Sequence, residues 1–241
     1  EDVFEKARHY QVGVDSTGTP RYCDNFINDY YDDEGWWALA WIEASKLTGE
    51  KKYLDMAEII FDDMTTGWSD ACGGGIFWKN PLHYKNSIAN NLFSLTAIRL
   101  YKATQNPAYL DWFKKNVDWY TQTGMINTDI YQIEDGTKDD CTPNRNAHYT
   151  YNQGVAIAVL AEMYLQTNDK SYLELAEKIA DATITTQLVT DEGILREMKP
   201  EIDDSNDGVQ FKGIFIRHLA FLYEVTKNPA YKDFILKNAE S

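Results

Sequence analysis

Two adjacent carboxylates, Asp32 and Asp33, are the side chains of this sequence best suited to catalysis. Glycoside hydrolysis commonly uses two carboxyl groups, one ionised and one protonated, about 5–5.5 Å apart in retaining enzymes and about 6.5–9.5 Å apart in inverting ones. Neighbouring residues of a helix diverge by roughly 100°, yet their carboxyl groups can still reach the shorter separation. Like charges this close raise one of the two pKa values, as a general acid requires. The alternative is that the pair only caps a helix, because acidic residues are favoured in a first turn.

Four segments of similar make-up accompany the carboxylate pair or contain it. Each mixes aromatic side chains with carboxylate, amide or amine groups, and they are residues 30–37, 84–90, 149–154 and 207–213. Aromatic faces beside hydrogen-bonding side chains suit a carbohydrate, whose C–H faces stack while its hydroxyl groups need fixed partners. A phosphate site would instead favour clustered Arg and Lys, and these segments contain two lysines and no arginine.

Other chemical motifs are incomplete. The Cys72-Gly-Gly-Gly75 segment lacks the Gly-Lys-Ser/Thr ending of a phosphate-binding loop. Residues 203–208 imitate the start of a calcium loop, but the twelfth position is Ile214 instead of Glu. The four histidines share no metal-ligand spacing, and no Ser/His/Asp order is credible. We therefore expect no metal and no cofactor.

A repeat of about sixty residues organises the elements that must position these groups. Four short segments begin with Thr48, Thr104, Thr167 and Thr226, and each carries a tyrosine five residues later. Each separates two stretches with apolar residues at i, i+3, i+4 and i+7, which predicts a helical hairpin with a tight turn. A further helical fragment is expected around residues 2–10. Strand-like alternation is scarce and confined to stretches such as residues 75–78.

The connections between hairpins are longer, at about residues 67–85, 124–151 and 190–207. Hairpins in series place the short turns on one face and the long loops on the other. The four aromatic–polar segments begin the first helix of each hairpin, so we expect them to converge on the long-loop face, where sites usually lie. The alternative is that the long loops are tolerated insertions.

Composition excludes several classes of function. The 241 residues carry a net charge of −15, which argues against phosphate-backbone binding and against an anionic membrane surface. No apolar run approaches the roughly 20 residues of a membrane span. Aromatic residues make up 14%, including 7 Trp, and we divide the tryptophans into core and ligand candidates. Trp41, Trp112 and Trp119 lie within predicted helices and are assigned to the core, whereas Trp36, Trp37 and Trp78 lie at the expected site.

Three cysteines, Cys23, Cys72 and Cys141, are too few for a disulfide scaffold. The sequence is compatible with one disulfide and one free thiol, and equally with three reduced thiols. The pairing partner of Cys72 is likewise open.

Six ordered motifs resemble glycoside hydrolase family 76, the α-1,6-mannanases. They cover about residues 28–226 and are Tyr31-Asp32-Asp33-Glu-Gly-Trp36-Trp37-Ala-Leu-Ala, Cys72-Gly-Gly-Gly-Ile-Phe-Trp78, Tyr84-Lys-Asn86-Ser-Ile-Ala-Asn90, Tyr151-Asn152-Gln153-Gly154, Gly193-Ile-Leu-Arg-Glu197 and Phe211-Lys212-Gly213-Ile-Phe. The resemblance implies an all-α fold, an (α/α)6 toroid whose inner helices begin at the substrate cleft. We expect residues 1–241 to form one toroid catalytic domain with about four of the six hairpins visible, lacking the first helix and the last hairpin. An open variant of the toroid is the alternative.

The resemblance also implies a retaining endo-α-1,6-mannanase with Asp32 as nucleophile and Asp33 as acid/base. The substrate-binding residues expected on this basis and from the four segments are Trp36, Trp37, Trp78, Tyr84, Asn86, Tyr151, Asn152, Gln153, Asp207 and Lys212. Alternatives for the function are a cell-wall mannan or mannoprotein transglycosylase, a non-catalytic mannan-binding module and a helical interaction scaffold. The expected partner is α-mannan or a manno-oligosaccharide, with no nucleic acid and no membrane span. We expect a monomer, and the resemblance places it outside the cell or at its surface.

Overall fold

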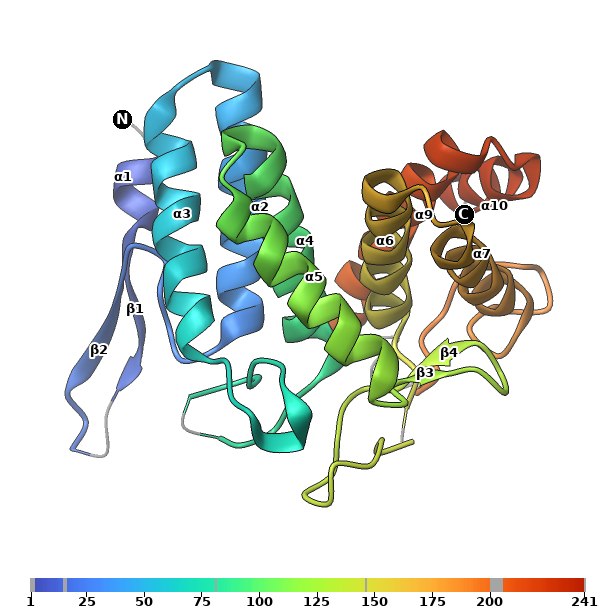
Figure 1. Cartoon of the computed structure of the whole chain (residues 1–241), viewed down its shortest axis with the longest axis horizontal. Coiled ribbons are helices and arrows are strands. Elements are labelled where there is room, and N and C mark those ends of the chain that lie inside the picture. The colour runs from blue at the N-terminus through green and yellow to red at the C-terminus, as the bar shows by residue number, and fades with distance from the viewer. Residues whose placement is uncertain (1–2, 15–16, 81, 146, 200–205, 241) are drawn as a thin grey trace.

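The described part of the chain folds as four helical hairpins in series, preceded by a short helix and a two-stranded sheet (Figure 1). The computed structural model describes residues 3–14, 17–80, 82–145, 147–199 and 206–240. The hairpins pair α2 (Tyr31–Thr48) with α3 (Lys51–Thr66), α4 (Ser87–Thr104) with α5 (Pro107–Gln122), α6 (Thr150–Thr167) with α7 (Lys170–Thr185), and α9 (Asn206–Thr226) with α10 (Pro229–Ala239). The predicted order of hairpins is confirmed.

The repeated threonine ends the first helix of every hairpin, and its hydroxyl group builds the turn. Thr104 Oγ1 donates to the carbonyl of Leu100 and accepts the backbone N–H of Asn106. Asn106 then caps the next helix by accepting the N–H of Ala108, and Pro107 occupies the first helical turn. One left-handed residue reverses the chain in each hairpin, namely Gly49, Gln105, Asn168 and Lys227. Local chemistry therefore fixes the tight turns.

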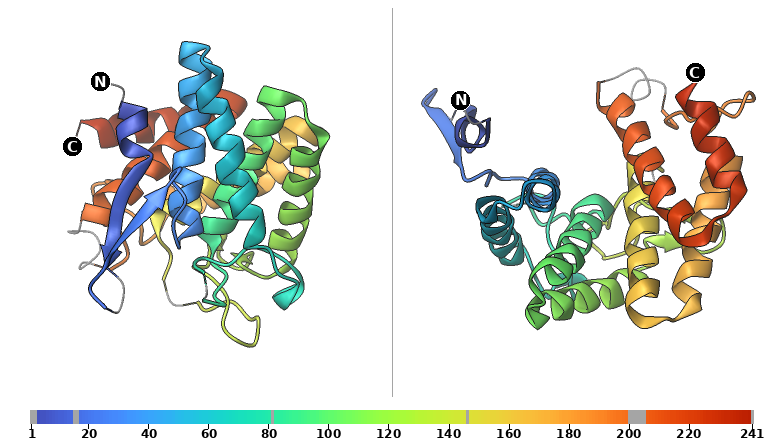
Figure 2. Two further views of the ribbon diagram at one scale, coloured as in Figure 1. Left: turned by 90° about the vertical axis from the view of Figure 1, so that its left-hand side faces the viewer. Right: turned by 90° about the horizontal axis from the view of Figure 1, so that it is seen from above.

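The first helix of each hairpin lies in an inner layer. Helix α2 contacts α4, α4 contacts α6, and α6 contacts α9. Helices α4 and α6 are buried on nearly all sides, whereas α3, α5 and α7 bury one face each. Seen from above, the hairpins follow an arc (Figure 2). This arrangement of helices is that of a partial (α/α) toroid, as predicted.

Glycines near the start of the inner helices allow these helices to approach closely. A Cβ atom at Gly154 of α6 would lie 2.7 Å from Cα of Phe215 in α9. A Cβ atom at Gly35 of α2 would lie 2.8 Å from Cβ of Leu92 in α4. The motif glycines are therefore packing residues that set the spacing of the inner layer.

We expect Gly154→Ala to lower the free energy of unfolding by about 1–3 kcal/mol, because backbone on two packed helices must move apart. Gly213→Ala in α9 is the matched control, since nothing lies within 4 Å of its added Cβ. That change should be neutral or should stabilise the helix by up to about 1 kcal/mol. Urea unfolding followed by circular dichroism measures both, and equal effects of the two changes would contradict the close-approach argument.

The strands differ from the prediction. Helix α1 (Val3–Ala7) is shorter than the expected helical fragment, and β1 (His9–Val14) pairs antiparallel with β2 (Pro20–Asp24). A second small sheet, β3 (Ile126–Asn127) with β4 (Gln132–Ile133), lies in the second long connection. The strand-like alternation at residues 75–78 corresponds to no strand, and an isolated bridge joins Ile76 to Trp68 there. Positive φ at Gly74 and Gly75 prevents an extended run.

Two contacts tie down the loop that carries the short helix η1 (Ala71–Gly73). Cys72 and Cys141 form a disulfide, and Cys23 is free and buried. The fully buried Lys85 ammonium donates to the carbonyl oxygens of Ser69, Ala71 and Gly74. Burial lowers the pKa of Lys85 to about 8, so the group remains charged at neutral pH. Its three acceptors hold the loop in one shape.

Candidate active site

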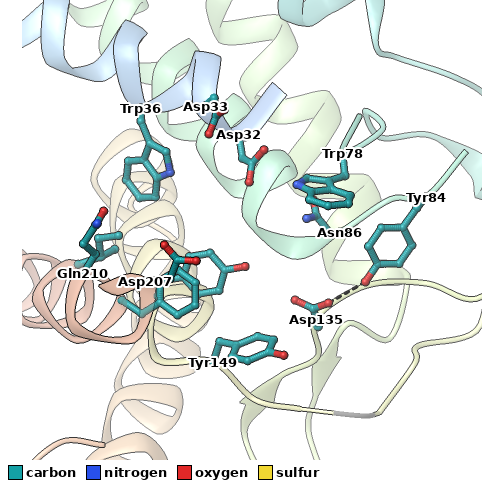
Figure 3. Close-up of a pocket in the computed structure, with 13 residues that line it drawn as sticks. Asp32, Asp33, Trp36, Trp78, Tyr84, Asn86, Asp135, Tyr149, Asp207 and Gln210 are labelled. Atoms are coloured by element: carbon teal, nitrogen blue, oxygen red, sulfur yellow. Dashed lines mark hydrogen bonds between the residues drawn. The ribbon is translucent and has the colours of Figure 1, made fainter. Parts of the chain in front are cut away.

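A cavity of about 520 Å³ opens where the inner helices begin. In the close-up, Asp32 and Asp33 lie on one side of it, and Asp135, Tyr149 and Asp207 lie on the opposite side (Figure 3). The lining residues come from α2, the loop before α4, the segment after β4, and the starts of α6 and α9. They are Asp32, Asp33, Trp36, Trp78, Tyr84, Asn86, Asp135, Tyr149, Tyr151, Asp207, Gln210, Phe211 and Ile214. The predicted convergence of the four segments at the long-loop face is confirmed.

The carboxylate pair occupies the first turn of α2, and each member has a polar neighbour. The indole of Trp78 lies beside Asp32 and lowers its pKa, against the larger effect of burial. The side-chain Nδ2 of Asn28 donates to Oδ2 of Asp33 at 3.1 Å. The residue before the helix, Tyr30, makes no side-chain cap. The start of α2 therefore coincides with the cavity wall, and no side-chain cap hydrogen bond is formed at this helix start.

Both carboxyl groups hold their protons more tightly than free aspartate does. Burial, followed by the neighbouring charge of Asp33, raises the pKa of Asp32 to about 7. Burial also raises the pKa of Asp33, while the Asn28 hydrogen bond opposes that rise. The pair can therefore hold a proton near neutral pH, which general acid catalysis requires.

A third carboxylate, Asp135, faces the pair from across the cavity. Its Oδ2 accepts the hydroxyl of Tyr84 at 2.7 Å, and its Oδ1 accepts Nδ2 of Asn152 at 3.2 Å. Tyr84 also accepts a hydrogen bond from Asn144 at 3.0 Å. Sequence reasoning missed Asp135 because it lies inside a long loop, outside the four segments at helix starts.

Aromatic rings form much of the cavity wall. Tyr151 stacks on Phe211 with ring centroids 4.0 Å apart and an interplanar angle of 10°. Trp78 meets Tyr30 and Tyr84 edge to face. Burial raises the pKa of Tyr151 well above its ordinary value, so its hydroxyl remains neutral. Two residues of this aromatic wall, Tyr149 and Phe211, lie in the four aromatic–polar segments but were not predicted to bind substrate.

The buried Glu197 holds the start of α6 in place. Its carboxylate accepts both the backbone N–H and the hydroxyl of Thr150. A carboxylate at this position is favoured by the helix dipole. The Gly193–Glu197 motif therefore supports the helix that carries Tyr151 and does not itself line the cavity.

Four predicted binding residues lie outside the cavity lining. Trp37 packs against Phe26 and Trp41 in the core, because neighbouring helix residues point roughly 100° apart and Trp37 is therefore turned away from Trp36. Asn152 is fully buried, and it contacts the cavity lining by donating a hydrogen bond to Asp135. Gln153 accepts the N–H of Ile133 and donates to its carbonyl, which ties α6 to β4. Lys212 is half-buried in α9 and is not among the lining residues.

The predicted core tryptophans behave as expected: Trp41, Trp112 and Trp119 pack in the two apolar clusters of the described chain. Within the described ranges, no group of three His, Cys, Asp or Glu side chains is placed to hold a metal ion. Residues 203–205 of the incomplete calcium-loop motif lie outside the described residues. None of the helices that the structure describes is long and apolar enough to cross a membrane.

Comparisons with known proteins agree on one family. The sequence model described as glycosyl hydrolase family 76 matches residues 1–241. The mannan endo-1,6-alpha-mannosidase DCW1 of Saccharomyces cerevisiae is 29% identical over 90% of this chain and 51% of its own length. The chain spans about half the length of the curated relatives it matches.

The solved structures that resemble this chain include a family 76 mannanase. The GH76A alpha-1,6-mannanase of Salegentibacter sp. HEL1_6 superposes with a TM-score of 0.82 and 29% identity, covering 89% of this chain and 64% of that one. The Lin0763 protein of Listeria innocua superposes with a TM-score of 0.79 and 34% identity, covering 89% and 61%. An inactive variant of the Salegentibacter enzyme, with two adjacent aspartates changed to asparagine, was solved with alpha-1,6-mannotriose.

Proposed function

Because the chain belongs to glycosyl hydrolase family 76, we propose that it is a retaining endo-α-1,6-mannanase. The observation that carries the proposal is the pair Asp32 and Asp33, placed side by side at the wall of an aromatic cavity, with Asn28 donating a hydrogen bond to Asp33. Two neighbouring carboxyl groups that share one proton, one ionised and one protonated, are the chemical equipment of glycosidic cleavage.

In the proposed reaction, an oxygen of ionised Asp32 attacks the anomeric carbon of a mannose unit. The glycosidic C–O bond breaks, and its oxygen takes the proton of Asp33. Asp33, now ionised, then accepts a proton from water while the water oxygen attacks the anomeric carbon and releases Asp32. One water molecule is consumed for each bond cleaved, and the configuration is retained.

The proposed substrate is an uncharged α-1,6-linked mannan. Aromatic rings at Trp36, Trp78 and Tyr151 offer faces for the C–H surface of a sugar, and Asn86, Asp135 and Asp207 offer hydrogen-bond partners for its hydroxyl groups. An inactive variant of the Salegentibacter enzyme was solved in complex with alpha-1,6-mannotriose. That complex supports the choice of α-1,6-linked mannan as the substrate proposed for this chain.

The test is incubation of the chain with linear α-1,6-mannan, followed by analysis of product lengths and of the anomer formed first. Internal cleavage with retention supports the proposal. Longer products at high acceptor concentration would mean transglycosylation, and binding without cleavage would mean a mannan-binding module; either result replaces hydrolysis as the function.

We place the protein outside the cytoplasm. The Cys72–Cys141 disulfide supports this assignment, because such bonds persist in oxidising compartments.

Two adjacent tryptophans make a matched pair for testing the sugar platform. We expect Trp36→Ala to weaken binding of α-1,6-mannotriose about 3–10-fold, because a ring at the cavity wall is lost. Trp37→Ala should instead lower the free energy of unfolding by about 3 kcal/mol, since that ring packs on Phe26 and Trp41. Calorimetry in an Asp32→Asn background and urea unfolding measure the two effects. Equal losses of affinity would contradict the assignment of Trp36 to the platform.

A further inference from the structure

A third carboxyl group follows the pair and is fully buried. Glu34 has none of its surface exposed. Its Oε1 accepts the backbone N–H of Asn28 at 3.2 Å. Its Oε2 is buried without a hydrogen-bond partner among the described residues, and the charged neighbour of the side chain is Asp63 of α3. Within the described chain, no ion pair to Lys, Arg or His includes Glu34. Burial of a carboxyl group without a neighbouring cation favours its protonated form.

The different burial of Glu34 and its neighbour Asp63 indicates which of the two carries the proton. Two carboxyl groups can share a hydrogen bond only if one of them is protonated, and Asp63 is half-buried whereas Glu34 is fully buried. Burial, followed by the charge of Asp63, raises the pKa of Glu34 to about 9. We therefore treat Glu34 as a neutral acid that accepts the Asn28 N–H and can donate its proton to the neighbouring Asp63.

Asn28 connects this neutral acid to the reacting pair. Its backbone N–H is held by Glu34, and its Oδ1 accepts the N–H of Tyr30 at 2.6 Å. These two contacts fix the loop before α2 and leave the Asn28 side chain one orientation. In that orientation Nδ2 donates to Oδ2 of Asp33 at 3.1 Å. One oxygen of Asp33 is engaged, so the other remains for proton exchange.

We propose that Asn28 is a positioning residue for the acid/base Asp33, and that protonated Glu34 anchors Asn28 through its backbone. The proposal rests on the proposed glycosidase function. A neutral anchor has a clear physical advantage here. An ionised Glu34 would place a third negative charge beside Asp32 and Asp33, whereas an apolar residue could not hold the Asn28 N–H.

Several titratable groups face these residues and enter the pH dependence. Around Glu34 they are Asp63 on α3, Tyr31 and Asp33 on α2, and Cys23 on β2. Tyr10 of β1 faces the Asn28 side chain, and burial raises the pKa of Tyr10 while Asn28 opposes that rise. Asp33 faces Asp32 on its own helix, and Tyr84, Asp135, Tyr149, Tyr151 and Asp207 line the same cavity.

The first experiment removes the link to Asp33. Asn28→Ala should lower kcat about 10–100-fold with KM changed less than about 3-fold, because the acid is misplaced while the sugar platform remains. Loss of the donor also raises the pKa of Asp33, so the alkaline limb of the activity profile should move up by about 0.5–1 pH unit. Asn80→Ala, an exposed asparagine of the neighbouring loop, is the control. An unchanged alkaline limb in Asn28→Ala overturns the positioning role.

The second experiment tests the proton on Glu34 without using activity. Glu34→Gln keeps one acceptor and one donor, so it should retain kcat and the pH profile within about 3-fold. At pH 7 the infrared difference between wild type and this variant should contain the carbonyl band of a protonated carboxylic acid. Glu162→Gln is the matched control, because the buried Glu162 is paired with Lys102 and should give carboxylate bands only.

A carboxylate band for Glu34, or a large loss of activity in Glu34→Gln, overturns the neutral-anchor role. The infrared result stands even if wild type cleaves no mannan. Absence of cleavage by wild type would therefore reject the proposed function and leave the test of Glu34 intact.

Discussion

Changing either Asp32 or Asp33 to Asn should lower the rate of α-1,6-mannan cleavage at least about 1,000-fold, as measured by reducing-end release. Nucleophilic and acid/base roles each supply a large part of the rate, and an amide supplies neither a nucleophilic oxygen nor an acidic proton. The two variants should still fold, because both side chains lie at the cavity wall and a neutral amide relieves like-charge repulsion.

The two variants should differ in how they are rescued. A small anion such as azide should restore turnover of an activated mannoside by Asp33→Asn, since the anion needs no base, but should not restore the retaining reaction of Asp32→Asn. Asp62→Asn, an exposed residue of α3, is the surface control. If either cavity variant retained wild-type activity, the assigned mechanism would be wrong.

The pH dependence of the same reaction follows from the burial of Asp32. A nucleophile must be ionised, and the pKa of Asp32 in the free protein is about 7. Since kcat/KM reports ionisations of the free enzyme, we expect kcat/KM to fall as pH falls through about 7.

Removing the disulfide with Cys72→Ser and Cys141→Ser together should lower the free energy of unfolding by about 4 kcal/mol. The bond closes a loop with a sequence separation of 69 residues, and cross-links of this length remove much of the freedom of the unfolded chain. Urea unfolding with and without reductant measures the effect. Reductant should destabilise wild type by the same amount and leave the double variant unchanged.

The same change should affect the cavity, because the bonded loops support its wall. The Cys72 carbonyl accepts the indole N–H of Trp119, and the loop after Cys141 carries Asn144, which donates to Tyr84. We therefore expect a higher KM in the double variant. Cys23→Ala tests whether Cys23 takes part in the disulfide instead. The stability of this variant should remain sensitive to reductant, and a loss of that sensitivity would contradict the Cys72–Cys141 bond.

The hairpins could be predicted from the sequence because their determinants are local. Each repeated threonine bonds to a carbonyl four residues before it and to an N–H two residues after it, as Thr104 does with Leu100 and Asn106. Helical periodicity and turn chemistry therefore located the helix starts, and with them the aspartate pair. The short strands escaped prediction because their pairing partners, such as Cys23 for Tyr10, lie beyond a loop.

The sequence alone determined which helix starts carry polar and aromatic side chains, since spacing along the chain decides that. Only the tertiary structure decided which of those side chains enter the cavity. Trp36 and Trp37 are identical in type and adjacent, but the roughly 100° turn between neighbouring helix residues sends one to the cavity and the other to the core. Asp135 and Asn28 reach the site from loops, and their roles depend on distances between segments that no local pattern encodes. Packing between distant segments therefore completed a site whose centre, Asp32 and Asp33, was already visible in the sequence.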